Sequence, residues 1–191
     1  VLDSGQDAVP YAVKQRLAWA VPNEEAFDAV ARYSPSGVVE IGAGVGYWAR
    51  LLRARGVDVV AFDPEPPGEA SDWHSGYAWS EVQHGDHTVV AKHPDRTLLL
   101  VWPSYNLGWT DAVVELYAGD TVVYVGEPPG GCTGTDRMHQ LLGGETSCWC
   151  FEDPCDCPPT VPARFREVER VGIPQWWGLN DYLSVHQRLS R

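Results

Sequence analysis

Short, largely apolar runs recur along the chain and alternate with segments of helical spacing. The run Thr97–Trp102 is apolar on both faces, as a central strand of a parallel sheet is. Residues 166–173 and 182–188 form two further runs, which are close enough in sequence to pair antiparallel. The remaining predicted strands cover 38–41, 58–62, 79–84 and 121–126.

Between these runs, apolar residues recur at the three- and four-residue spacing of helices that pack on a sheet. The predicted helices cover 11–20, 24–33, 47–55, 110–117 and 135–142. Alternating strands and helices predict an α/β fold with a mostly parallel seven-stranded sheet that ends in an antiparallel strand pair. At 191 residues the chain is expected to form a single domain over 1–191, with N-terminal helices within 1–35.

The most informative segment is Val-Val-Glu-Ile-Gly-Ala-Gly-Val-Gly-Tyr over residues 38–47. Its alternating glycines, Gly42, Gly44 and Gly46, join a buried strand to a helix start, where free N–H groups and unusual backbone angles suit a bound ligand. The next strand stops at Asp63, whose carboxylate can accept hydrogen bonds from both hydroxyls of a ribose. Together these features predict a cofactor that contains a nucleoside.

The spacing of this turn distinguishes between cofactors. A nicotinamide-binding turn has a small residue where this chain has Tyr47. The pattern Glu-x-Gly-x-Gly-x-Gly instead resembles motif I of the class I S-adenosylmethionine-dependent methyltransferases. The resemblance spans residues 36–191 and implies a three-layer Rossmann-like sandwich with S-adenosylmethionine as cofactor. It implies cofactor contacts from Glu40, Gly42, Gly44, Gly46, Tyr47, Trp48 and Asp63.

Further candidates follow the later strands, because ligands of such sheets lie beyond the carboxyl ends of the strands. Asp86, in Gly-Asp-His, is similar to the family residue that bonds the adenine amino group; the alternative is an exposed turn aspartate. Glu127, at the end of the strand 121–126, is a candidate general base, or else a solvated turn residue.

The loop Trp102-Pro103-Ser104-Tyr105-Asn106 occupies the position where nucleic-acid amino-methyltransferases carry Asp/Asn-Pro-Pro-Tyr. Trp102 replaces the acid or amide of that motif, so methylation of nucleic acid bases is not expected. Trp102 and Tyr105 can form an apolar or cation-binding wall around a sulfonium, with Tyr105 also a catalytic candidate. The alternative for Trp102 is packing in the core.

Other aromatic and imidazole side chains are candidates for lining an acceptor pocket. The two histidines placed near such loops are His74 and His139; each is otherwise an ordinary surface or core residue. The tryptophans considered are Trp73, Trp79, Trp109, Trp176 and Trp177.

The net charge of −12 comes from 26 acidic and 14 basic side chains. Nucleic acids and anionic membranes would be repelled by this charge, so we expect a small substrate that is neutral or cationic. Without a signal peptide or a long apolar stretch, the expected location is the cytoplasm. The short chain is consistent with a homodimer or a small protein partner that completes the pocket.

Four cysteines lie close together at Cys148, Cys150, Cys155 and Cys157, within an apparent insertion over 143–162. Each pair has one intervening residue, whereas zinc pairs usually have two. A structural metal, disulfides and free thiols all stay open, and no metal is expected in the active site.

The favoured function is methyl transfer from S-adenosylmethionine to a small molecule, in secondary metabolism by analogy. The first alternative is a non-methylating reaction on the same fold, such as the elimination or ring closure of aziridine-forming enzymes in antibiotic biosynthesis, with or without a partner subunit. The second is a non-catalytic ligand-binding or scaffolding subunit, although a scaffold has no need of the glycine turn.

Overall fold

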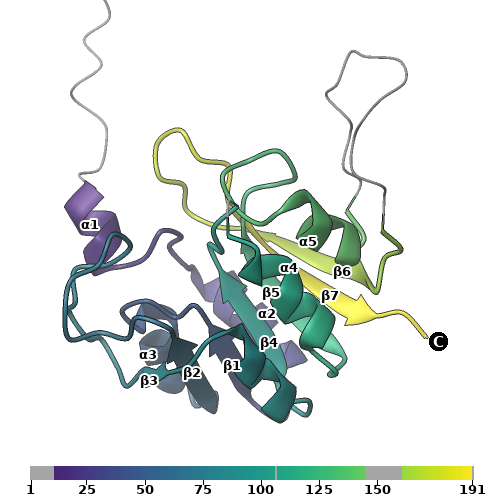
Figure 1. The fold of residues 1–191 in the computed structure, drawn as a ribbon, viewed down its shortest axis with the longest axis horizontal. Helices are drawn as coiled ribbons and strands as arrows, with labels where there is room; N and C mark the ends of the chain where they lie inside the picture. Colours follow the sequence, from purple (N-terminus) through teal and green to yellow (C-terminus); the bar gives the residue numbers. More distant parts are fainter. Residues whose placement is uncertain (1–10, 106, 145–160, 191) are drawn as a thin grey trace, which may run out of the picture.

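A computed structural model describes residues 11–105, 107–144 and 161–190, which form a seven-stranded sheet with helices on both faces (Figure 1). The strand order is β3-β2-β1-β4-β5-β7-β6, with β7 antiparallel to both β5 and β6 and the other pairs parallel. The predicted fold class is therefore confirmed. The strands are β1 (Val38–Ile41), β2 (Val59–Asp63), β3 (Gln83–His84), β4 (Thr97–Val101), β5 (Thr121–Gly126), β6 (Phe165–Gly172) and β7 (Tyr182–Arg188).

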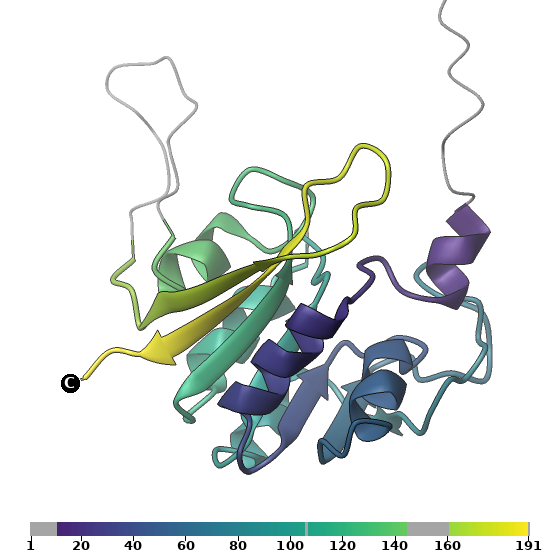
Figure 2. The ribbon, with the colours of Figure 1, turned by 180° about the vertical axis from the view of Figure 1, so that it is seen from behind.

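Two hydrophobic cores lie on opposite faces of the sheet, and the helices divide between them (Figures 1 and 2). The helices are α1 (Tyr11–Arg16), α2 (Glu24–Tyr33), α3 (Tyr47–Arg53), the 3-10 helix η1 (His87–Lys92), α4 (Trp109–Leu116) and α5 (Asp136–Leu141). Helices α2 and α3 cover one face, and η1, α4 and α5 cover the other. Alternate residues of the central strands enter opposite cores; Leu99 faces the first and Leu98 the second.

Two predicted elements are shorter than expected. The helix predicted over 11–20 ends at Arg16, and none of its residues is buried, so no core holds it in a longer helix. The strand predicted over 79–84 is only Gln83–His84. Trp79 and Ser80 instead bond to the glycine turn, through Trp79 N–H to the Val45 carbonyl (2.9 Å) and Ser80 Oγ to the Gly46 carbonyl (2.9 Å).

The carboxyl ends of β1, β2, β4 and β5 meet at one edge of the sheet. That edge holds the candidate site. In the described ranges, no helix is long and apolar enough to cross a bilayer. The cysteine cluster lies outside the described residues; Cys132, in the loop after β5, is exposed.

Candidate functional site

The three turn glycines all have positive φ, at 75° for Gly42, 51° for Gly44 and 71° for Gly46. Side chains rarely adopt these angles, which confirms that the turn needs glycine for its backbone. A Cβ on Gly46 would meet Ser80 Oγ at 2.8 Å, whereas a Cβ on Gly44 would meet nothing within 4 Å. Gly46 is therefore required for packing, and Gly44 faces open space.

Asp63 lies at the end of β2 and joins the turn to the loop that follows. Its Oδ2 accepts the Gly44 N–H at 2.8 Å and its Oδ1 accepts the Glu65 N–H at 2.8 Å. Burial raises the pKa of this carboxyl, and the two N–H donors oppose that rise. Each carboxylate oxygen has a second lone pair, so Asp63 keeps acceptor capacity for a ligand.

Glu40, within β1, is 1% exposed. Burial raises its pKa to about 8, with the Arg53 charge acting in the opposite direction. Its Oε2 has no hydrogen-bond partner among the described residues. An unpartnered buried oxygen is costly, and it is the arrangement expected where a ligand donor completes the site.

A cavity of about 290 Å³ lies over the turn. From one end to the other it passes residues that follow β3, β2, β1 and β4, in the order of the strands. Its described lining comprises Trp19, Ile41, Gly42, Gly44, Asp63, Pro64, Glu65, Trp73, His74, Asp86, His87, Val101, Trp102, Pro103, Ser104, Leu107 and Trp109. A smaller adjoining cavity of about 60 Å³ reaches Glu40, Lys14, Tyr47 and Trp48.

The segment after α1 closes one side of this site. Trp19 Nε1 donates to the Trp73 carbonyl (3.1 Å), and Gln15 exchanges hydrogen bonds with the same loop, including Ser75 N–H to the Gln15 carbonyl (3.1 Å). Figure 2 shows α1 away from the sheet and beside this loop. Trp19 was not identified from the sequence, because its placement depends on these distant contacts.

Trp102 is the only described residue other than glycine with a positive φ, at 51°. This conformation costs roughly 1–2 kcal/mol, and such strain is often found at functional sites. Its Nε1 donates to Asp181 Oδ1 at 3.1 Å, and its ring stacks on Trp19 with centroids 4.8 Å apart. Trp102 therefore lines the cavity as well as packing against the core.

Asp181, also missed from the sequence, is 2% exposed and has an unpartnered Oδ2. Burial raises its pKa to about 6, and the bond from Trp102 opposes that rise.

Glu127 has the same kind of backbone partners as Asp63 but lies away from the cavity. It is buried, its Oε2 accepts the Cys132 N–H (2.7 Å) and its Oε1 accepts the Asn180 N–H (3.1 Å). These bonds join the loop after β5 to the loop between β6 and β7. Glu127 is not among the described residues that line the two cavities over the turn. Its role as a base stays a prediction.

The other predicted residues take varied positions. Asp86 is exposed at the cavity rim, and two hydrogen bonds from Thr88 lower the pKa of its carboxyl. Tyr47 is half-buried beside Trp79, whereas Trp48 is buried and donates from Nε1 to the Ala20 carbonyl (2.9 Å). Tyr105 is 57% exposed and is not among the described cavity-lining residues.

The remaining aromatic and imidazole candidates separate into two groups. Trp73, Trp109 and His74 line the cavity; His74 is locked between the Glu65 carbonyl (2.6 Å) and the Gly76 N–H (3.1 Å). The others lie elsewhere: Trp79 and Trp176 donate to backbone carbonyls, Trp177 is 74% exposed, and His139 lines a separate cavity beside β5 and β7.

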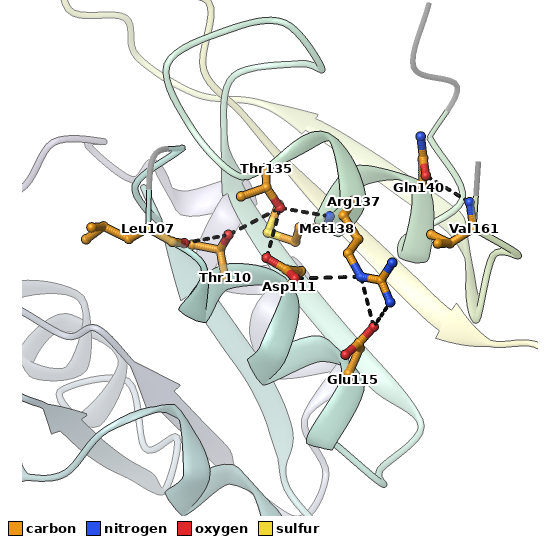
Figure 3. A network of polar contacts seen from close by, with 9 residues as sticks. All are labelled: Leu107, Thr110, Asp111, Glu115, Thr135, Arg137, Met138, Gln140 and Val161. Atoms are coloured by element: carbon orange, nitrogen blue, oxygen red, sulfur yellow. Dashed lines mark hydrogen bonds and ion pairs between the residues drawn. The ribbon is translucent and has the colours of Figure 1, made fainter. Parts of the chain in front are cut away.

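A polar network fixes the start of α4, which carries Trp109 into the cavity (Figure 3). Thr135 Oγ1 caps α5 by accepting the Met138 N–H (3.1 Å) and lies 3.3 Å from Asp111 Oδ1. Arg137 then pairs with both Asp111 and Glu115 on α4. The network joins α4 to α5 beside the α4 edge of the cavity.

Comparison with known proteins agrees with this geometry. A family model described as a methyltransferase domain matches residues 16–109, which contain the glycine turn, Asp63 and Asp86. No curated protein sequence matches the chain. The glycine motif and this match identify a methyltransferase domain over residues 16–109, and the strand order is that of the class I, Rossmann-like methyltransferase fold.

Two solved structures illustrate the shared fold. The first is 1,6-didemethyltoxoflavin-N1-methyltransferase from Burkholderia thailandensis (14% identity, TM-score 0.51, covering 87% of this chain and 78% of that chain). The second is magnesium protoporphyrin IX methyltransferase from Synechocystis PCC 6803 (12% identity, TM-score 0.50, covering 86% and 83%). Both were solved with bound S-adenosylhomocysteine. At these identities the likeness shows the fold.

Proposed function

We propose that this protein transfers a methyl group from S-adenosylmethionine to a small-molecule acceptor, as a cytoplasmic enzyme of secondary metabolism. The observation that carries the proposal is the cavity of about 290 Å³ over the glycine turn, with Asp63 and Asp86 toward one end and the tryptophans toward the other. S-adenosylhomocysteine in two structures of the same fold supports the choice of cofactor.

The residues present fit this cofactor. Asp63 would accept hydrogen bonds from the ribose, Asp86 would lie near the adenine, and the open space over Gly44 would take the adjoining atoms. Glu40 would ionise beside a cationic ammonium group, which would partner its free Oε2. Tyr47, Trp48 and Lys14 border the small cavity on that side.

When bound, S-adenosylmethionine supplies a methyl group on an electrophilic sulfonium. The protein then needs chiefly to align the acceptor and exclude water. Three tryptophans that border both cavities would align the acceptor and exclude water: Trp19, Trp73 and Trp102. In this proposal Glu127 holds its two loops in place, and Tyr105 contributes at the exposed entrance.

A non-methylating reaction, such as elimination or ring closure, is the second candidate. Trp102 stands where a family of amino-methyltransferases has an acid or amide, and this departure favours the alternative. Incubation of the protein with S-adenosylmethionine and an accepted substrate separates the two. Methyl transfer produces S-adenosylhomocysteine and a product that carries an added methyl group, whereas elimination or ring closure leaves the methyl donor intact.

Calorimetric titration with S-adenosylmethionine and S-adenosylhomocysteine tests the proposal. We expect both to bind, and Asp63→Ala to weaken both by about tenfold or more because a charge-assisted hydrogen bond is lost. Asp95→Ala is the matched control, an exposed aspartate in the turn before β4. Absence of binding to the folded protein would overturn the proposal. Light scattering of the same sample tests the predicted homodimer.

A further inference from the structure

The cavity has an apolar end, formed largely by the loop after β4. Its lining there is dominated by Trp19, Trp73, Trp102, Pro103, Leu107 and Trp109. Ser104 adds a hydroxyl. His74, next to Trp73, also lines the cavity, but both of its ring nitrogens are bonded to backbone groups. Asp181 bonds Trp102 from behind and is not among the described lining residues. The acids Asp63, Glu65 and Asp86 all belong to the opposite end, after β2 and β3.

The indoles at this end are held in place by contacts outside the cavity. Trp102 donates to the buried Asp181, and its main-chain N–H donates to the Val125 carbonyl at 2.7 Å. Trp19 donates to the Trp73 carbonyl and stacks on Trp102. Because the Nε1 donors of Trp19 and Trp102 are already used, these two rings offer a ligand carbon surface and π-electrons.

The charges of the lining select against anions. No lysine or arginine is among the described residues that line the large cavity, whereas three carboxylates are. Lys14 lies 5.8 Å from the centroid of the Trp19 ring but lines only the smaller adjoining cavity. Within the large cavity an anionic acceptor would find no cationic partner in the described lining and would be repelled by the carboxylates. Aromatic faces attract cations and stack on flat rings.

We propose that this end binds a flat, uncharged nitrogen heterocycle and that its ring nitrogen is the methyl acceptor. This inference rests on the proposed function. The nitrogen lone pair forms the new N–C bond, the S–C bond breaks, and its electron pair stays on sulfur. The positive charge passes from sulfur to nitrogen, and no proton has to leave.

Methylation of a ring nitrogen suits the side chains at the apolar end of the cavity. A hydroxyl acceptor would need a free base beside it. Both ring nitrogens of His74 are already bonded to backbone groups, and Asp181 is not among the described residues that line the cavity. A ring nitrogen needs no base, and the cationic product forms against indole faces that stabilise it.

The test measures binding of three flat bicyclic probes to the protein saturated with S-adenosylhomocysteine, by equilibrium dialysis at a pH where isoquinoline is unprotonated. The probes are isoquinoline, N-methylisoquinolinium and 2-naphthoate. We expect the first two to bind at least about tenfold more tightly than the anion.

Two variants of the lining test where the probe binds. Trp102→Leu should weaken isoquinoline binding by about tenfold, and the more exposed Trp73→Leu by about threefold. Trp177→Leu, outside the cavity, should not.

The binding results distinguish failure of this inference from failure of the proposed function. Equal or tighter binding of 2-naphthoate, or no binding of any probe to protein that holds S-adenosylhomocysteine, overturns this inference and leaves the proposed function standing. Failure of S-adenosylhomocysteine itself to bind removes the proposed function, and the acceptor assignment with it. Unchanged isoquinoline affinity in both lining variants would place the probe elsewhere and would also overturn the inference.

Discussion

Two regions of the same sheet edge hold buried carboxylates that differ in their access to the cavity. At the ends of β1 and β2, Glu40 has an oxygen without a partner and Asp63 borders open space. At the end of β5, both oxygens of Glu127 accept backbone N–H groups, as those of Asp63 do, but Glu127 is not among the described residues that line the cavity. The difference separates a carboxylate that stabilises loops from carboxylates that can accept a ligand. Asp181 lies between these cases, since one oxygen bonds Trp102 and the other is unpartnered.

The largest loss of stability on substitution is expected at Glu127. Glu127→Leu leaves the N–H groups of Cys132 and Asn180 without acceptors, so we expect the free energy of unfolding to fall by about 3 kcal/mol. Urea unfolding followed by circular dichroism measures it. Glu127→Gln keeps one carbonyl acceptor and should lose about half as much. A loss below about 1 kcal/mol in the leucine variant would contradict the structural role.

Substitutions at Gly46 and Gly44 separate a residue needed for packing from one that borders the cavity. Gly46→Ala combines a positive φ with a contact of 2.8 Å to Ser80 Oγ, and should cost about 2–3 kcal/mol of stability. Gly44→Ala carries only the backbone cost of about 1 kcal/mol, but its methyl group projects into open space beside the cavity, so S-adenosylhomocysteine affinity should fall by about tenfold. Thermal unfolding and calorimetry measure the pair. Wild-type affinity in Gly44→Ala would mean that the ligand does not lie against the turn.

The raised pKa of Glu40 predicts that the stability of the folded protein depends on pH. Its folded-state pKa is raised from 4.5 to about 8, so its contribution to stability is fully present below 4.5 and is lost as pH rises toward 8. The slope approaches about 1.4 kcal/mol per pH unit within that window. Glu40→Gln should remove this slope in urea titrations at several pH values. An identical slope in both proteins would show that Glu40 is not the group responsible.

The smallest effect is expected at Tyr105, which is 57% exposed. Tyr105→Phe should change the free energy of unfolding by less than about 0.5 kcal/mol and leave S-adenosylhomocysteine affinity unchanged. A methyl-transfer rate reduced by more than about tenfold in this variant would support the prediction that Tyr105 is a catalytic residue.

The sequence predicted those parts of the molecule that local pattern determines. The glycine turn and Asp63 follow from residues adjacent in the chain, and the β4 and β5 strands follow from their apolar runs. Helix α1 and strand β3 were predicted, but the early end of α1 and the late start of β3 were not, because they depend on contacts with the loop between β2 and β3. Trp19 and Asp181 were missed for the same reason, since only the folded chain brings both to Trp102.

The central claim is that the cavity over the glycine turn holds the adenosyl cofactor, and a co-crystal structure with S-adenosylhomocysteine tests it most directly. The account predicts ribose hydroxyls within hydrogen-bond distance of the Asp63 carboxylate, adenine beside Asp86 and the sulfur near Trp102. A ligand bound elsewhere, with Trp19 and Trp102 still stacked across an empty cavity, would contradict it.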